Sequence, residues 1–247
     1  MKQTILFLLL AMMSMVALAA GDEAKAEEKR PLKGFERIEM QGNLDVRYRQ
    51  GSAFSVVVRA PRAVIKKVET RVEDNKLVVR MKPSSSIFSL RRVSGADVTV
   101  LVTSPDLIGV ELSGSGDFEC RTHLDTDVLD LKVKGSGDID FWDVICDRVN
   151  VSVTGSGDAE LKKLVAQQSN LQLVGSGDVK VNQQNVSLTR IELKGSGDVK
   201  VGCTQCGKVE ARLMGSGDIT LTGDVRQLNK TVRGSGDVET KGLKVNR

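Results

Sequence analysis

The tetrapeptide Gly-Ser-Gly-Asp occurs seven times in the second half of the chain at an almost constant spacing. Its aspartates are Asp117, Asp138, Asp158, Asp178, Asp198, Asp218 and Asp237. The intervals between them are 21, 20, 20, 20, 20 and 19 residues. A period this regular is typical of stacked repeats, in which each unit buries its apolar face against the units above and below it.

Apolar residues alternate with polar ones on both sides of each copy. Two residues before the first glycine stand Leu112, Val133, Val153, Leu173, Leu193, Leu213 and Val232. Directly after the aspartate stand Phe118, Ile139, Ala159, Val179, Val199, Ile219 and Val238. Alternation with a period of two predicts strands, and 20 residues are too few for a βαβ unit, which needs about 30. We therefore predict an all-β fold, a β-solenoid with rungs of about 20 residues.

The repeated tetrapeptide is predicted to form the corner of each rung. Counting by twos from the preceding apolar residue places both glycines inward and places the serine and aspartate outward. A bend toward the axis leaves no room for inward Cβ atoms and can demand φ values that only glycine adopts cheaply. The predicted corner residues are Gly114, Gly116, Asp117, Gly135, Gly137, Asp138, Gly155, Gly157, Asp158, Gly175, Gly177, Asp178, Gly195, Gly197, Asp198, Gly215, Gly217, Asp218, Gly234, Gly236 and Asp237.

The outward aspartates would form a ladder of like charges, because stacked strands lie about 4.8 Å apart. Their repulsion can be offset if each carboxylate accepts hydrogen bonds from backbone N–H groups of its own corner. Bound calcium is the alternative, since this ion prefers carboxylate and carbonyl oxygens. The hydrogen-bonded corner is favoured because the 20-residue period does not match the calcium-binding nonapeptide repeat. We assign no metal ligand and no cofactor, and a calcium-binding solenoid stays an alternative.

The N-terminal half carries a weaker form of the same pattern. Asp97 precedes Asp117 by 20 residues and is followed by Val98 and Val100 in the same alternation, which predicts that the rung beginning near Ser94 belongs to the stack. Residues 38–48 copy the column pattern too. Further strands are predicted at 54–58, 68–72 and 77–81, with a turn at "EDNK" and an exposed loop at "KPSSSIFSLRR". These irregular coils are predicted to cover one end of the solenoid; a separate small β-domain is the alternative.

The N-terminus has the layout of an export signal. Lys2 is followed by an apolar run from Ile5 to Ala20, which is shorter than the about 20 residues of a membrane span. Small residues at its end predict a signal peptide at 1–20, cleaved after Ala19 or Ala20. Residues 21–33 are predicted to be a solvated polar leader, and 34–247 one solenoid domain, with irregular coils at 34–112 and regular rungs at 113–247. The mature protein is therefore expected outside the cytoplasm, with no membrane span.

Composition argues against nucleic-acid binding. The formal net charge is +4, and loss of Lys2 leaves +3, with basic and acidic residues interspersed. Aromatic residues make up 3% of the chain, and Trp142 and Tyr48 are the single members of their types. Neither a basic stripe nor a series of stacking platforms for bases is present.

Few residues offer catalytic chemistry. The single histidine, His123, could join Ser115 and Asp117 in a triad, but an exposed loop residue is the preferred interpretation. A polysaccharide lyase or hydrolase on the solenoid is the enzymatic alternative. Its acid, base and cationic groups would be Asp138, Asp140, Asp158, Glu160 and Lys180. Regular stacking brings such carboxylates together without any catalytic role, so we expect a non-enzymatic protein.

Four cysteines stand at Cys120, Cys146, Cys203 and Cys206. Export permits disulfides, and Cys203 and Cys206 are close enough in "CTQC" to form one locally. Cys120 and Cys146 occupy different positions of adjacent rungs and are harder to join. Free thiols are the second interpretation. A four-cysteine zinc site ranks last, because its ligands would come from separated rungs.

The stretches "FERIEMQGNLDVRYRQG" and "SPDLIGVELSGSGD", followed by tandem Gly-Ser-Gly-Asp rungs, resemble the head GIN domain family of auto-transporter adhesins over nearly all of Gly34 to Val245. The resemblance implies a right-handed parallel β-helix, and a secreted, periplasmic or cell-surface location in a Gram-negative bacterium. It implies an adhesin without supplying an activity. We expect an envelope scaffold or binding module whose partner is a glycan or an envelope protein.

Overall fold

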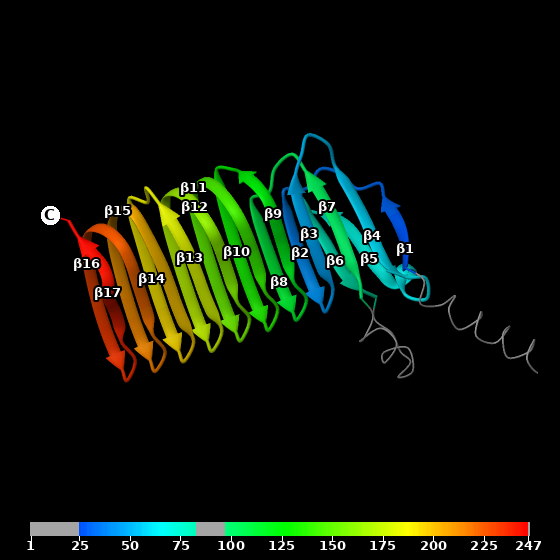
Figure 1. The fold of residues 1–247 in the computed structure, drawn as a ribbon. Coiled ribbons are helices and arrows are strands. Elements are labelled where there is room, and N and C mark those ends of the chain that lie inside the picture. Colours follow the sequence, from blue (N-terminus) through cyan, green and yellow to red (C-terminus); the bar gives the residue numbers. More distant parts are fainter. Residues whose placement is uncertain (1–24, 83–96, 247) are drawn as a thin grey trace, which may run out of the picture.

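The computed structural model describes residues 25–82 and 97–246, which form a parallel β-solenoid of about seven turns (Figure 1). The fold predicted from the 20-residue period is confirmed. The predicted signal peptide, its cleavage site at Ala19 or Ala20, and nearly all of the predicted "KPSSSIFSLRR" loop lie outside the described residues. They stay predictions.

The regular rungs are built from ten strands. These are β8 (Gly109–Gly114), β9 (Phe118–Asp125), β10 (Val128–Gly135), β11 (Ile139–Gly155), β12 (Ala159–Gly175), β13 (Asp178–Gln184), β14 (Leu188–Gly195), β15 (Asp198–Gly215), β16 (Ile219–Gly234) and β17 (Val238–Val245). Successive rungs pair in parallel, and like residues stand opposite like: Gly155 is aligned with Gly175, and Gly175 with Gly195. The repeat in sequence is thus a repeat in space.

The core is the continuous interior of the coil. Along β11, residues 139, 141, 144, 146, 149, 151 and 153 are buried, so the alternation is interrupted twice and each rung consists of three short straight segments. Aliphatic residues fill most of the interior. Three aromatic rings stack along the axis: Tyr48 lies 6.3 Å from Phe118, and Phe118 lies 5.4 Å from Phe141, between ring centroids.

Stacking order differs from chain order in the N-terminal half. Strands β2 (Arg37–Gly42) and β3 (Asp45–Gln50) pair directly with β8 and β9, while β6 (Lys76–Met81) and β7 (Thr99–Ser104) lie on their other side. The strand that follows Asp97, β7, belongs to the stack as predicted, but β3 lies between it and β9. The rung of Asp45 is thus the neighbour of the first regular corner: Gly42 is aligned with Gly114, has a φ of +101°, and is followed by the buried Leu44.

Antiparallel strands cover the N-terminal end of the stack (Figure 1). Strand β4 (Ser55–Pro61) pairs with β7, and β5 (Val68–Glu73) pairs with β6 through a turn in which Asp74 and Asn75 have positive φ. A 3-10 turn, η1 (Ile65–Lys67), connects β4 to β5. The strands predicted at 54–58, 68–72 and 77–81, and the turn at "EDNK", are confirmed.

Part of the expected leader is ordered. Residues 25–30 form strand β1 (Lys25–Arg30), which pairs antiparallel with β4. The charged side chains find partners there: Glu27 lies 2.7 Å from Arg59, and the Arg30 guanidinium donates to the carbonyl oxygen of Ile65 at 3.3 Å. This segment differs from the solvated leader predicted from its composition because an open sheet edge offers backbone hydrogen bonds that do not depend on side chains.

Candidate binding groove

Each Gly-Ser-Gly-Asp corner stacks backbone against backbone. In the third corner from the start of the repeats the first glycine, Gly155, has a φ of +123°, and in the fourth Gly175 has +142°. A Cβ on Gly175 would lie 2.0 Å from the carbonyl oxygen of Gly155, and one on Gly177 would lie 1.9 Å from that of Gly157. Glycine is needed because the neighbouring corner occupies this space along the stack, rather than because the interior is crowded.

The outward aspartates form a ladder of hydrogen bonds between rungs. Asp138 Oδ1 accepts the backbone N–H of Asp158 at 2.9 Å, and Asp158 Oδ1 accepts that of Asp178 at 2.8 Å. The series begins at Asp45 and continues to Asp237. The expected bond to the N–H of its own corner is wrong for the inner rungs. Asp237, which ends this ladder, does bond to the N–H of Val238 at 2.7 Å.

The ladder carries an electrostatic cost that the N–H groups offset. Burial raises the pKa of Asp138, and the like charges of Asp158 and Asp117 raise it further, while the backbone N–H of Asp158 lowers it. Burial likewise raises the pKa of Asp117. Within residues 25–82 and 97–246, no three His, Cys, Asp or Glu side chains are placed to hold a metal ion.

The candidate catalytic carboxylates lie on adjacent rungs. Asp140, Glu160 and Lys180 are aligned across β11, β12 and β13, next to the corner residues Asp138 and Asp158. Burial, and then the charge of Glu160, raise the pKa of Asp140. The stack brings the five residues together as the sequence suggested, but they do not line either of the two hollows described below.

His123 lies in strand β9, not in a loop, and its side chain has a carboxylate partner. Its Nδ1 is 3.0 Å from Oδ2 of Asp143, whose Oδ1 is 3.0 Å from Nζ of Lys163. Partial burial opposes ionisation of Asp143, but the hydrogen bonds from Lys163 and His123 lower its pKa overall. The histidine belongs to a surface ion-pair network and not to a serine-containing triad.

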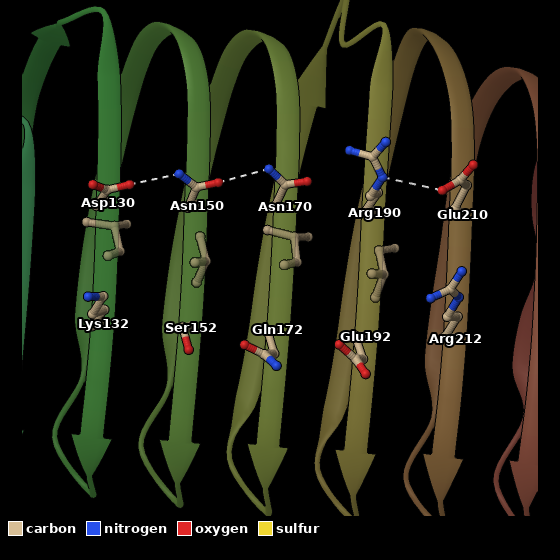
Figure 2. Close-up of a pocket in the computed structure, with 14 residues that line it drawn as sticks. Asp130, Lys132, Asn150, Ser152, Asn170, Gln172, Arg190, Glu192, Glu210 and Arg212 are labelled. Carbon is tan, nitrogen blue, oxygen red and sulfur yellow. Dashed lines mark hydrogen bonds and ion pairs between the residues drawn. The ribbon is translucent and has the colours of Figure 1, made fainter.

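A shallow groove of about 410 Å³ crosses the outer face of five consecutive rungs (Figure 2). Two polar columns border it, at the positions five and three residues before the first glycine of each corner. The first column is Asp130, Asn150, Asn170, Arg190 and Glu210. The second is Lys132, Ser152, Gln172, Glu192 and Arg212. The strands are β10, β11, β12, β14 and β15.

The first column is held by its own contacts. Asn150 Nδ2 donates to Asp130 Oδ1 at 2.8 Å, and Asn170 Nδ2 donates to Asn150 Oδ1 at 2.8 Å. Arg190 Nε lies 3.4 Å from a carboxylate oxygen of Glu210. These bonds fix one wall of the groove, as the dashed lines in Figure 2 show.

The second column is largely free to bind a ligand. Lys132, Ser152, Gln172 and Arg212 form no side-chain hydrogen bond or ion pair within the part of the chain that the structure describes, whereas Glu192 pairs with Lys194 at 2.7 Å. Across both columns three acidic residues face three basic ones, so the groove has no net formal charge. It therefore offers hydrogen-bonding groups on a fixed spacing, with amides in the middle rungs and charged groups on either side of them.

The chain matches a family described as "putative auto-transporter adhesin, head GIN domain" over residues 34–201 and 169–247. The protein belongs to this family. The resemblance noted from the Gly-Ser-Gly-Asp rungs is confirmed. No curated protein is significantly similar to the chain. Within its described residues, this head GIN domain has no helix long and apolar enough to cross a membrane.

Solved structures share the fold of this head GIN domain. A putative adhesin from Bacteroides fragilis superposes with a TM-score of 0.73 at 23% identity, covering 89% of this chain and 98% of that chain. One from Parabacteroides distasonis gives 0.72 at 19%, with 89% and 98% covered. Another, from Parabacteroides merdae, gives 0.67 at 18%, with 89% and 97% covered.

The cysteines of this head GIN domain are free and buried. The structure does not contain the predicted Cys203–Cys206 disulfide, which stays a prediction for the oxidised protein. Cys120 lies inside β9 and Cys146 inside β11, and burial raises the pKa of both thiols, that of Cys146 to about 12. Within the described residues, no three of these thiols are placed to hold one metal ion.

Proposed function

We propose that the protein is an exported, non-enzymatic adhesin module of the cell envelope that binds an uncharged glycan along the groove of Figure 2. Membership of the adhesin family supports an adhesin-like function and a location outside the cytoplasm or at the cell surface. The single observation that carries the choice of ligand is the free second column, whose hydrogen-bonding groups recur once per rung.

The spacing favours an extended, repetitive ligand. Parallel strands lie about 4.8 Å apart, so the five rungs of the groove extend for about 20 Å along the axis. Each rung adds a weak contact, and contacts within one ligand chain reinforce one another because the later ones are intramolecular. A polymer of sugar units can meet such a series, whereas a compact ligand would meet only one or two rungs.

The charge balance favours a neutral ligand. An acidic polysaccharide would gain from a cationic surface, but the groove has as many acidic side chains as basic ones, three of each, although Lys132 and Arg212 pair with none of these acids. Hydroxyl groups of an uncharged glycan can donate to Gln172 and accept from Lys132 and Arg212 without loss of a counter-ion. An extended polypeptide of an envelope protein is the alternative occupant.

A binding panel tests the proposal. The mature protein is immobilised and exposed to neutral glycans, acidic glycans and unfolded envelope polypeptides at two salt concentrations. We expect saturable binding of a neutral glycan with little salt dependence, since few ion pairs form or break. Binding of acidic glycans alone, or of polypeptide alone, would contradict the glycan assignment.

One observation favours the enzymatic alternative. Raised pKa values at Asp138 and Asp140 are a property of carboxyl groups that act as general acids. Cleavage of a polysaccharide by the purified protein, lost in Asp138→Asn and Asp158→Asn, would establish it. Absence of turnover on the same glycan panel would leave the binding function.

A further inference from the structure

A cluster of polar side chains lies inside the solenoid, where the interior is otherwise mostly aliphatic. Its members are Gln183, Thr189, Cys203 and Cys206. The inward column that contains Val144 and Leu164 continues with Gln183 and then Cys203. The register between β15 and β16 shifts between Cys203 and Cys206, and Gln205 between them has a φ of +53°. This bulge points both cysteines inward, and they are 3% and 1% exposed.

The Gln183 side chain lies against both thiols. Its Nε2 is 3.5 Å from Cys203 Sγ, 3.8 Å from Cys206 Sγ and 2.6 Å from Thr189 Oγ1. Gln183 is 2% exposed, yet its Oε1 has no hydrogen-bond partner in the described structure, and neither does the buried Oγ of Ser169. Native proteins rarely leave buried polar atoms unsatisfied, and such atoms often mark a ligand, ion or water.

A hollow on the outer face lies next to the cluster. A hollow of about 370 Å³ is lined by Gln183 and Cys203, and by Gly202 and Gly223, which carry no side chain to close it. Lys163 stands at its rim, but its charge is paired with Asp143 at 3.0 Å. The hollow therefore ends beside Cys203, whose side chain is itself buried.

We propose that reduced Cys203 and Cys206, with the Gln183 carboxamide, form a binding site for one thiophilic d10 metal ion, Cu(I) or Zn(II). Thiolate ligands select these ions over calcium and magnesium, which prefer oxygen. Two thiolates suffice for Cu(I), which accepts two-coordinate geometry. Zn(II) takes four ligands, for which Gln183 Oε1 and a water molecule would complete the set after a half-turn of the amide.

The two cysteines bind the ion as thiolates. Each thiol that becomes a ligand releases its proton to solvent, and the oxidation state of the metal does not change. The site is separate from the outer groove, so it goes beyond the adhesin function. A Cys203–Cys206 disulfide would remove both ligands.

Metal titration of the fully reduced mature protein tests the site. Cu(I) is added anaerobically against a chromophoric chelator, and Zn(II) is added against a second one in a parallel experiment. We expect one equivalent of one of these ions to bind, and the two titrations show which. Cys203→Ser and Cys206→Ser should each abolish binding, whereas Cys120→Ala with Cys146→Ala should leave the single equivalent intact.

A second measurement uses the unaltered protein and is independent of any folding defect in the variants. Bound metal should protect Cys203 and Cys206 from alkylation, as mapped by mass spectrometry, while Cys120 and Cys146 react as without metal. Gln183→Leu, which restores the aliphatic column, should weaken binding about tenfold or more. Lack of saturable binding by the reduced protein, or binding that survives in the Cys203→Ser/Cys206→Ser double variant, would overturn the proposal.

Discussion

Asp138 Oδ1 accepts the backbone N–H of Asp158 from the next rung at 2.9 Å, so each corner is bonded to its successor through a side chain as well as through the sheet. Replacing Asp138 separates the two roles of this carboxylate. Asp138→Ala removes the acceptor and should cost about 1–3 kcal/mol of unfolding free energy. Asp138→Asn keeps a carbonyl oxygen and removes a charge, so its stability should equal or exceed that of the wild type at pH 7. Chemical denaturation of the wild type and the two variants measures both effects. An Asn variant as unstable as the Ala variant would show that the side-chain oxygen does not stabilise the stack as a hydrogen-bond acceptor.

Calcium should have no effect on stability. The aspartate carboxylates already accept N–H groups from the next rung, and in the described residues no acidic group is arranged as a metal site. We expect equal thermal midpoints with added calcium and with chelator. A ligand of the folded state must raise the midpoint, so an increase that depends on calcium concentration would establish the alternative.

The first glycine of a corner should tolerate no side chain. Gly175→Ala places a Cβ 2.0 Å from the carbonyl oxygen of Gly155 at a φ of +142°, and should cost about 3 kcal/mol or more, measured by denaturation. Gly202→Ala is the matched control. Its Cβ would meet the Asn182 side chain, which can move, so a small change is expected. Equal losses in both variants would show that the corner backbone is not the obstacle.

The ion pair of Asp143 should be visible in the pH dependence of stability. Its folded-state pKa is lowered by Lys163 and His123, so the stabilisation is present above the unfolded pKa of about 4 and is lost as the pH falls through the folded value. The wild type should be more stable than Asp143→Asn at pH 7, and the difference should shrink below pH ~4. Thermal melts from neutral to acidic pH measure it.

Asp140 is the control, because its effect on stability should depend on pH in the opposite direction. Burial and Glu160 raise its folded-state pKa, so its stabilising effect is present below the unfolded pKa and is lost as the pH rises through the folded value. Asp140→Asn should therefore be more stable than the wild type at neutral pH, with the two converging in acid. The same direction of change in both variants would contradict these assignments.

The solenoid could be predicted from the sequence because its corner and its aliphatic columns recur in nearly every rung. The order of the N-terminal rungs could not, because the spacing of Asp97 and Asp117 does not reveal that the rung of Asp45 lies between theirs. Non-local strand pairing sets this order: Gly42 is aligned with Gly114, and Val46 with Phe118.

The groove was missed because its residues change from rung to rung. A search for repeated letters finds Gly-Ser-Gly-Asp but not a column in which Asn150 and Asn170 are followed by Arg190. Reading outward positions down the stack, five and three residues before each corner, would have shown the run of amides and balanced charges. The interior cluster around Gln183 was also missed, because its meeting with Cys203 and Cys206 depends on a bulge.

The most direct test of the account is ligand binding by a variant with a blocked groove. Ser152→Trp places a large ring within the second column, between Lys132 and Gln172, and Lys200→Trp, on another outer face, is its control. With both variants folded and melting within a few degrees of the wild type, binding of the neutral glycan should be lost in Ser152→Trp and unchanged in Lys200→Trp. Unchanged binding in Ser152→Trp would contradict the groove as the binding site.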